Sequence, residues 1–274
     1  MKATASIYLL IAAATAFFNA SFAYPMDMTD VMQIKSEHDG DDVSSFVHVA
    51  QDPDQKLTIE DVASPGFSGF SKNTKKNLNF GFTRATVWLK LNVLNTTDVT
   101  RRLALKCEYP LIDSIDLYFA DEKGFSKIAL GREVPFSSQQ IAYRGFAFPI
   151  EIMPGEQKTY YLSVRASSTM TIPLQIIEHE KLKNQIITET GILGAYFGVI
   201  GGIFLYNFFI WISTRSRAYA AYLFFLATSV AFYLAWTGMG RQYLWGDSTW
   251  WSLRSWSIPA GLLGMGTLLF EKLF

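Results

Sequence analysis

The feature that most constrains the fold is the loss of charge in the second half of the chain. Residues 190–213 contain no charged side chain over 24 positions, and residues 218–240 form a second apolar stretch of 23 positions without charge. Each stretch is long enough to cross a bilayer as an α-helix. A third apolar run covers residues 256–274. The sequence therefore predicts three transmembrane helices, at 190–213, 218–240 and 256–274.

Acidic residues are concentrated before these apolar stretches. Of the 24 acidic side chains, 21 lie between Asp27 and Glu180, and only Asp247 and Glu271 follow Glu189. A polar first half followed by an apolar second half is typical of a soluble domain attached to a membrane domain. We therefore expect two parts in this chain.

Residues 1–23 have the organisation of a secretory signal peptide. Lys2 supplies a small positive region, an apolar run extends from Ile7 to Phe18, and small residues occupy positions 21 and 23. We expect cleavage after Ala23. The alternative is an uncleaved transmembrane helix, for which the apolar run is short. Cleavage would place the following domain outside the cytoplasm.

Residues 24–45 are polar and are expected to form a loose leader, in which one strand is a candidate. The acidic segment at residues 38–42 lacks the ligand spacing and the closing Glu of a calcium-binding loop. A solvated turn is the expected structure for that segment.

Residues 46–183 alternate apolar and polar side chains in short runs separated by turn signals. The clearest run is residues 85–95, in which Val87, Leu89 and Leu91 share one face of a strand. Similar runs occupy residues 46–50, 101–109, 114–119, 125–131, 143–152, 158–167 and 171–179. Eight or nine short strands with little helix predict an all-β sandwich of jelly-roll type.

Three residues refine this expectation. Thr58 and Asp61 form a capping box, which predicts a short helix at 59–63. Pro173 predicts that the last strand is an edge strand or contains a bulge, because proline has no backbone N–H to donate to a neighbouring strand. The single cysteine, Cys107, excludes an intrachain disulfide and follows strand spacing, so it is expected to be a buried apolar residue.

The first two apolar stretches are joined by a very short connection. Arg215 and Arg217 lie between them, which predicts a tight turn. The signal peptide implies that this turn is cytoplasmic, whereas counting of positive charges agrees only weakly because Arg241 and Arg254 fall in the outer loop. Three helices without a cytoplasmic domain are expected to belong to an incomplete protein; the alternative is a complete three-helix protein.

Small residues recur on one face of the first predicted helix. Gly194, Gly198 and Gly202 follow the small-xxx-small spacing that permits close helix packing. This face packs either inside one helical bundle, which we favour, or between two copies of the chain in a homodimer. Asn207 is a candidate for a hydrogen bond between helices.

Catalytic and metal-binding patterns are weak in this sequence. Asp113 and Asp116 fall on opposite faces of one strand, so they do not form a carboxylate pair. The three histidines, His38, His48 and His179, lack the spacing of metal ligands. No phosphate-binding loop or nucleophile motif is present. We therefore predict no enzyme activity, no catalytic residue, no metal, no cofactor and no nucleic-acid partner.

Several segments together resemble a known receptor family. The segments "NFGFTRATVWLKLNVLN", "YPLIDSIDLYF" and "RGFAFPIEIMPGEQKTYYLSVRASSTMTIPLQI" are similar, in order, to the ectodomain strands of seven-transmembrane receptors with diverse intracellular signalling modules (7TMR-DISM). The segment "AYAAYLFFLATSVAFYLAWTGMG" and the tryptophan-rich loop after it are similar to the family's membrane core. The resemblance extends from about Phe46 to the end of the chain.

This resemblance implies a fold, a location and a function. The family's ectodomain is a jelly roll similar to carbohydrate-binding modules. The implied protein is a sensor in the bacterial inner membrane, with its N-terminal domain in the periplasm. It would bind a small molecule or a glycan and relay the signal to a cytoplasmic histidine kinase, diguanylate cyclase or phosphatase. Such an output module is absent from these 274 residues.

Five residues are candidates for ligand binding. Trp88 shares a strand face with Lys90 and Asn92, and an aromatic ring on a polar face can pack on a sugar. The alternative, which we favour, is that Trp88 packs under a loop or against the short helix. Arg144 and Arg165 are candidates for holding carboxylates or sugar hydroxyls, or else they pair with carboxylates of the chain itself.

Two other kinds of protein compete with the receptor hypothesis. One is a transport or envelope-assembly protein whose β-domain docks a protein partner. The absence of ionisable residues in the middle of the first two helices argues against an ion-coupled transporter. The other is an envelope enzyme, which the lack of a paired catalytic site makes least favoured.

Overall fold

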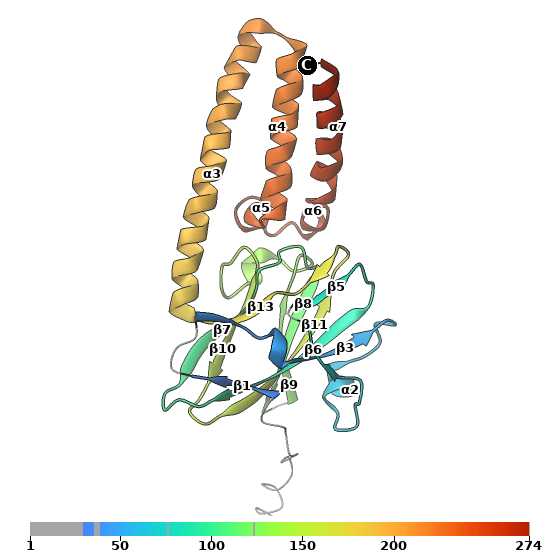
Figure 1. Ribbon diagram of the computed structural model, residues 1–274, viewed down its shortest axis with the longest axis vertical. Coiled ribbons are helices and arrows are strands. Elements are labelled where there is room, and N and C mark those ends of the chain that lie inside the picture. The colour runs from blue at the N-terminus through green and yellow to red at the C-terminus, as the bar shows by residue number, and fades with distance from the viewer. Residues whose placement is uncertain (1–29, 36–38, 76, 123, 274) are drawn as a thin grey trace, which may run out of the picture. The chain divides into compact units, whose positions relative to one another are not determined.

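The computed structural model describes residues 30–35, 39–75, 77–122 and 124–273 (Figure 1). The predicted signal peptide and its cleavage site lie outside the described residues, as does His38. The strands are β1 (Val31–Ile34), β2 (Asp39–Asp42), β3 (Val47–Asp52), β4 (Ser71–Lys72), β5 (Asn79–Gly81), β6 (Thr86–Asn95), β7 (Arg101–Cys107), β8 (Ser114–Asp121), β9 (Gly124–Leu130), β10 (Phe146–Ile152), β11 (Gln157–Arg165), β12 (Met170–Thr171) and β13 (Leu174–Glu178). The helices are α2 (Ile59–Ala63), α3 (His179–Thr214), α4 (Arg217–Trp236), α5 (Met239–Tyr243), α6 (Thr249–Arg254) and α7 (Ser257–Leu273).

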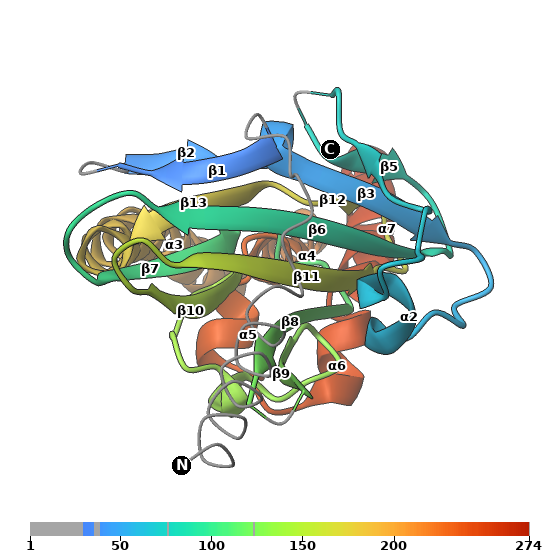
Figure 2. The same cartoon turned by 90° about the horizontal axis from the view of Figure 1, so that it is seen from below.

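Two main sheets form the first part of the chain, and a third, two-stranded sheet pairs β5 with β12. The larger sheet has the strand order β4-β3-β6-β11-β8-β9, and Figure 2 shows β3, β6 and β11 side by side within it. The smaller sheet has the order β10-β7-β13-β2. Apolar side chains of the two sheets form one core between them, as the alternation in β6 and β7 requires. The all-β sandwich predicted from the sequence is confirmed.

The short helix α2 forms where the capping box predicts it. The Asp61 amide donates to the Thr58 hydroxyl, and the Asp61 carboxylate accepts from the Thr58 amide at 2.8 Å. Ile59 and Val62 turn inward and bury against Trp88 of the larger sheet. The helix therefore covers part of the outer face of this sheet. The sequence pattern alone did not decide whether this face is covered or exposed.

The solvated turn expected at residues 38–42 and the edge strand expected at Pro173 were both wrong, although the predicted strand is interrupted at Pro173. The acidic segment expected to be a solvated turn contains β2, whose residues Asp41 and Asp42 pair with β13. Because β2 is an edge strand, the side chains of Asp41 and Asp42 stay exposed while the backbone pairs with β13. Pro173 does not make β13 an edge: the proline lies between β12 and β13, and β13 pairs with strands on both sides.

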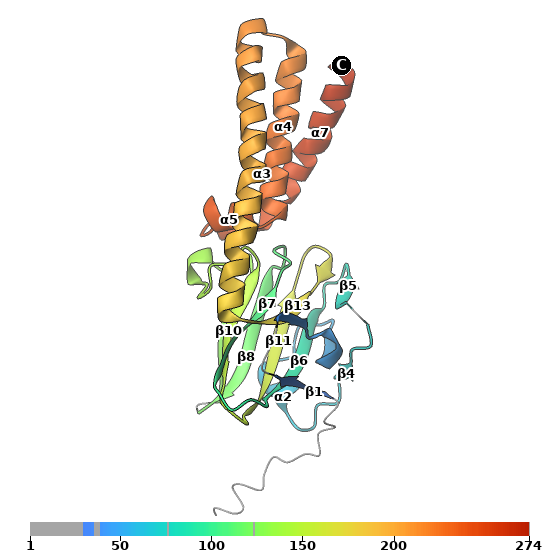
Figure 3. The same ribbon diagram turned by 60° about the vertical axis from the view of Figure 1, so that its left-hand side comes forward.

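The second part of the chain is helical. Two helices, α3 and α4, are long and apolar enough to cross a membrane, while α7 is a 17-residue apolar helix. In Figures 1 and 3, α4 lies between α3 and α7. The turn between α3 and α4 is tight, as predicted, and Arg215 adopts a left-handed conformation there. Helix α4 ends at Trp236, four residues before the expected boundary, because Gly238 takes a positive φ of 79°.

The expected contacts of α3 are not seen among the described residues. A Cβ atom built on Gly194, Gly198 or Gly202 would meet no atom of another element within 4 Å. The Asn207 side-chain amide donates to the Ile203 carbonyl at 2.8 Å, within its own helix, rather than to a neighbouring helix. Helices α3 and α4 do contact each other through the rings of Tyr196 and Tyr233, whose centroids lie 6.3 Å apart.

Cys107 lies fully buried in the sandwich core, as the sequence predicted. Burial raises the pKa of its thiol to about 12, so the thiol stays protonated at pH 8. We expect almost no maleimide labelling of the folded chain at pH 8 and complete labelling in denaturant. A Ser71→Cys variant, which carries an added cysteine at an exposed position, should label rapidly while folded. Rapid labelling of the unmodified folded chain would contradict the described core.

Candidate ligand site and its contacts with the membrane helices

The outer face of the larger sheet carries two adjoining rows of polar and aromatic side chains. One row is Trp88 of β6, Ser163 of β11 and Asp116 of β8, which lie opposite one another in the strand register. In the next row, Lys90 lies opposite Tyr161. The sheet thus places an aromatic ring, a hydroxyl and a carboxylate within reach of one ligand.

A cavity of about 400 Å³ opens over the first row, between the sheet and α2. Its sheet side is lined by Trp88, Asp116, Tyr118, Ser163 and Arg165. Gln55, Leu57 and residues 58–60, at the start of α2, contribute to the opposite side, and Thr86 of β6 completes the lining. The cavity therefore combines cationic, anionic and hydroxyl groups with two aromatic rings, which is the composition of a site for a polar ligand.

Trp88 is a wall of this cavity rather than an open platform. The residue is 3% exposed, and its ring lies 5.7 Å from the ring of Tyr118 at a tilt of 34°. It also packs against Ile59 and Val62 of α2, which is the packing that we favoured from the sequence. Among the described residues no acceptor contacts its buried indole Nε1. A buried donor without an acceptor is costly, and because this nitrogen is itself covered, it does not face the open part of the cavity.

Lys90 and Asn92 lie farther along the same strand face and do not line the cavity. The Lys90 ammonium lies 6.0 Å from the ring centroid of Phe70 and 5.9 Å from that of Tyr161, and burial lowers its pKa. Asn92 is buried and its Oδ1 accepts from the Thr159 hydroxyl at 2.8 Å. Of the five predicted site residues, the structure therefore brings only Trp88 and Arg165 together. A role of any of the five in binding stays a prediction.

Both candidate arginines have carboxylate partners within the chain. Arg165 donates to Glu133 at 3.1 Å, and both side chains are nearly half exposed. Arg144 lies just before β10 and donates from Nε to Glu189 of α3 at 2.9 Å. Arg144 is therefore part of the contact between the β-domain and the helices, away from the cavity.

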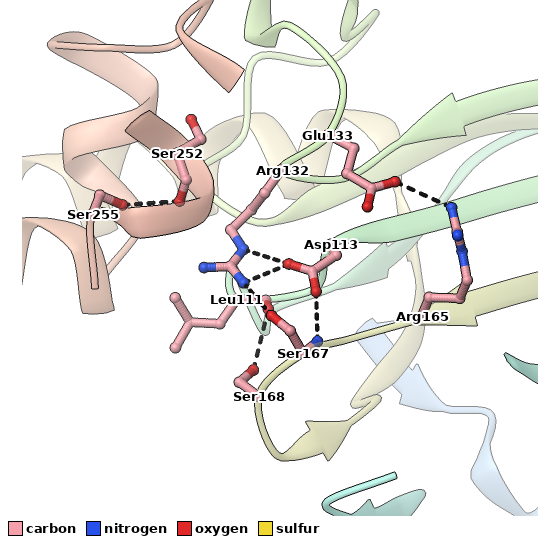
Figure 4. A network of polar contacts seen from close by, with 9 residues as sticks. All are labelled: Leu111, Asp113, Arg132, Glu133, Arg165, Ser167, Ser168, Ser252 and Ser255. Atoms are coloured by element: carbon pink, nitrogen blue, oxygen red, sulfur yellow. Dashed lines mark hydrogen bonds and ion pairs between the residues drawn. The ribbon is translucent and has the colours of Figure 1, made fainter. Parts of the chain in front are cut away.

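A buried ion pair lies beside the Arg165–Glu133 pair (Figure 4). Arg132, adjacent to Glu133 in the chain, donates from both Nε and Nη2 to Oδ1 of Asp113, the Nε distance being 3.1 Å. The other carboxylate oxygen of Asp113 accepts from the Ser167 amide. Asp113 therefore accepts an amide hydrogen bond from a segment 54 residues away in the chain. The sequence analysis missed Arg132, because nothing local marks its long-range partner.

The turn that carries these residues also contacts the membrane part of the chain. Arg241 of α5 donates from Nη2 to the carbonyl oxygens of Gly131 and Val134, at 2.9 and 3.1 Å. Its guanidinium lies over the rings of Phe136 and Phe146. Burial and the nearby positive charge of Arg132 lower the pKa of Arg241 to about 10. Arg241 was expected only as a charge of the outer loop.

Two further hydrogen bonds join the same turn to the loop between α5 and α6. The Ser137 amide donates to Oδ1 of Asp247, and the Phe136 amide donates to the Gly246 carbonyl, each at 2.9 Å. A Cβ atom at Gly246 would lie 2.7 Å from the Phe136 side chain, so only glycine permits this approach. Residues 131–137 therefore contact the ion pairs of the β-domain and the loop after α4.

Two models of one receptor family match the chain in succession. The model for the 7TMR-DISM extracellular 2 domain matches residues 44–178, and the model for the 7TM diverse intracellular signalling domain matches residues 189–274. The chain belongs to the 7TMR-DISM family, as the sequence segments suggested. It is a membrane protein in which an extracellular sensor domain precedes a transmembrane signalling domain.

Other comparisons add little. A search of curated proteins finds no match. One similar solved structure is described as TmCBM61 in complex with β-1,4-galactotriose; it is 10% identical, with a TM-score of 0.25, over 48% of this chain and 88% of that chain. A likeness this distant carries no argument about the ligand. In the described part of the chain, no group of three or more His, Cys, Asp or Glu side chains is placed to hold a metal ion.

The two neighbouring ion pairs should differ strongly in their effect on stability. Asp113→Asn leaves the buried Arg132 without a charged partner, which should cost about 3–5 kcal/mol. Glu133→Gln removes a partner of the half-exposed Arg165 and should cost only about 0–1 kcal/mol. Chemical unfolding of the detergent-solubilised chain, followed by circular dichroism, measures both. Equal effects of the two amide substitutions would contradict the described burial.

Proposed function

We propose that this chain is the sensing and transmembrane part of a bacterial inner-membrane receptor. Its periplasmic domain binds a small molecule or carbohydrate in the cavity beside Trp88. The bound state is relayed through residues 131–137 to the helices, and from them to a cytoplasmic output module such as a histidine kinase or diguanylate cyclase. The observation that carries the proposal is the continuity of contacts from Arg165 in the cavity to Arg241 on α5.

The mixture of groups around the cavity favours a ligand rich in hydroxyl groups. Each hydroxyl both donates and accepts hydrogen bonds, so it needs donors and acceptors within the same site. Arg165 and the Ser163 hydroxyl can donate, whereas Asp116 and Glu60 are acceptors. Asp116 is already paired with Lys127 at 2.7 Å, and Arg165 is paired with Glu133, so the charges around the cavity are largely balanced. This balance favours a neutral ligand over a strongly charged one, and the polar lining disfavours a purely apolar one. A neutral sugar or polyol fits this composition.

The pair of Arg165 and Glu133 is suited to respond to such a ligand. Because the pair is nearly half exposed, breaking it costs about 0–1 kcal/mol, which one ligand hydrogen bond to Arg165 can offset. Glu133 would then be released next to Arg132 and Val134. The ligand would thereby change the turn that holds Arg241.

The contact with the helices is also suited to a two-state change. Within the described residues, four buried polar atoms at this contact lack a hydrogen-bond partner: Nη1 of Arg132, Nε of Arg241, Nε1 of Trp245 and Oγ of Ser252. Unsatisfied buried groups offset part of the free energy of docking, so docked and released states would differ by a small free energy. A ligand needs only modest differential affinity to shift that equilibrium.

The proposal predicts a ligand-dependent rise in melting temperature that requires Arg165. The detergent-solubilised chain is melted with neutral oligosaccharides, polyols, uronic acids and peptidoglycan fragments. A ligand at 100 times its Kd should stabilise the chain by about 2.7 kcal/mol. Arg165→Gln should weaken binding about tenfold or more, because it removes a charged hydrogen-bond donor.

Arg102→Gln is the matched control. Arg102 also forms an exposed pair, with Glu151, but on the smaller sheet and outside the cavity. This variant should keep the full shift. A ligand whose shift is unchanged in Arg165→Gln does not use the proposed cavity. No shift with any compound would instead favour the docking of a protein partner on the β-domain.

A further inference from the structure

A second cavity, of about 470 Å³, lies where the first turns of α3 meet the β-domain. One side is polar and is lined by Glu108, Arg144 and Glu189. The other side is apolar and includes Ile192 and Leu193 of α3. It also includes Trp236, at the end of α4, and it shares no residue with the cavity beside Trp88.

The polar side is electrically balanced. Lys106, which is 2% exposed, donates to Oε1 of Glu108 at 2.7 Å. Arg144 pairs with Glu189 and also donates from Nη1 to the Thr237 carbonyl at 3.4 Å. Two positive and two negative side chains therefore leave this group without net charge.

One positively charged donor and one negatively charged acceptor remain available on this side. Among the described residues, no partner contacts Nη2 of Arg144 or Oε2 of Glu108. Burial acts to raise the pKa of Glu108, but the hydrogen bond from Lys106 and the charges of Lys106 and Arg144 lower it overall. Glu108 is therefore ionised at neutral pH. An occupant that matches both groups carries one cation and one anion.

The cavity lies at the expected boundary of the hydrocarbon layer. Glu189 is the last charged residue of α3 before the uncharged stretch, and Ile192 and Leu193 follow it within one turn. Ile192 is 66% exposed and Trp236 is 47% exposed, so both face the surroundings of the helices. Tryptophan at a helix end is typical of the membrane interface. An occupant that enters from this side meets lipid chains and headgroups.

We propose that this cavity binds a zwitterionic phospholipid whose headgroup ends in a primary ammonium. The ammonium donates to Glu108, the phosphate accepts from Arg144, and an acyl chain lies along Ile192, Leu193 and Trp236. An anionic lipid without an ammonium would leave Glu108 unmatched and would meet repulsion from Glu189. A choline headgroup carries the positive charge but has no N–H to donate to Glu108. The bound lipid contacts both the β-domain and the first two membrane helices.

Retention of lipid by the full chain tests this proposal. Delipidated protein in detergent is titrated separately with phosphatidylethanolamine, phosphatidylcholine and phosphatidylglycerol of identical acyl chains, and bound lipid is counted by native mass spectrometry. Phosphatidylethanolamine should bind about tenfold or more tightly than either competitor, the size expected for a charge-assisted hydrogen bond. Equal binding of the three lipids would overturn the proposal.

Two substitutions on α3 test whether the lipid binds in this cavity. Ile192→Trp fills the cavity from an exposed position and should abolish the preference for phosphatidylethanolamine. Val199→Trp is the matched control, because Val199 is 65% exposed, lies two turns farther along α3 and does not line the cavity. This control should retain the full preference. Loss of preference in both variants, or in neither, would contradict the assignment.

A third variant tests the headgroup chemistry. Glu108→Gln keeps an acceptor for Lys106 but removes the charge that attracts the ammonium, so phosphatidylethanolamine and phosphatidylcholine should bind about equally. Unchanged preference in this variant would overturn the role of Glu108. Soluble phosphoethanolamine should not compete at millimolar concentration, because it lacks the acyl chain. Effective competition would instead identify the occupant as a free solute.

Discussion

The buried ion pair between Asp113 and Arg132 is the interaction on which the rest of the arrangement depends. Asp113 accepts from Nε and Nη2 of Arg132 and from the Ser167 amide at once, so one carboxylate joins three segments that are distant in the chain. The backbone amides of Arg132 and Glu133 donate to the carbonyls of Ile112 and Asp113, which reinforces the same connection. Because both charged groups are almost fully removed from water, losing either one leaves the other unpaired at high cost.

The buried ion pair fixes the position of residues 131–137, and these residues make contacts on two sides. On the sheet side, Glu133 is held where it pairs with Arg165 at the edge of the first cavity. On the helix side, the carbonyls of Gly131 and Val134 are presented to Arg241. The buried ion pair therefore lies between two weaker contacts: the exposed pair of Arg165 and Glu133, and the contact with the helices, where some buried polar atoms lack hydrogen-bond partners. Such an arrangement is suited to signal transfer. The buried ion pair stays fixed while the weaker contacts exchange.

Much of the fold could be predicted because the evidence for it is local. Alternation in residues 85–95 gave the strand β6, Thr58 with Asp61 gave the helix α2, and spacing placed Cys107 in the core. The strand pattern alone did not decide between exposure and burial of Trp88, because burial depends on how α2 folds over the sheet. The expectation of a solvated turn at Asp39–Asp42 was wrong because acidic composition does not reveal whether a segment can pair with the edge of a sheet.

The candidate site could be predicted only in part, because its key contacts join residues far apart in the chain. Asp113 and Arg132 are 19 residues apart, and Arg241 is 110 residues from the Gly131 carbonyl that it contacts. No short pattern marks either partnership. The sequence predicted that Arg144 and Arg165 pair with carboxylates of a ligand or of the chain. Their partners, Glu189 and Glu133, could be named only from the structure.

The most direct test of the coupling is a disulfide cross-link between the β-domain and the loop after α5. In a Cys107→Ala background, Ser137→Cys is combined with Asp247→Cys, since the Ser137 amide and the Asp247 carboxylate are 2.9 Å apart. The account predicts efficient cross-linking in membranes under mild oxidation. It predicts none for Ser71→Cys with Asp247→Cys, because β4 lies at the opposite edge of the larger sheet from β9. Absence of the first cross-link, or equal yields of the two, would contradict the docking of the sensor domain on the membrane helices.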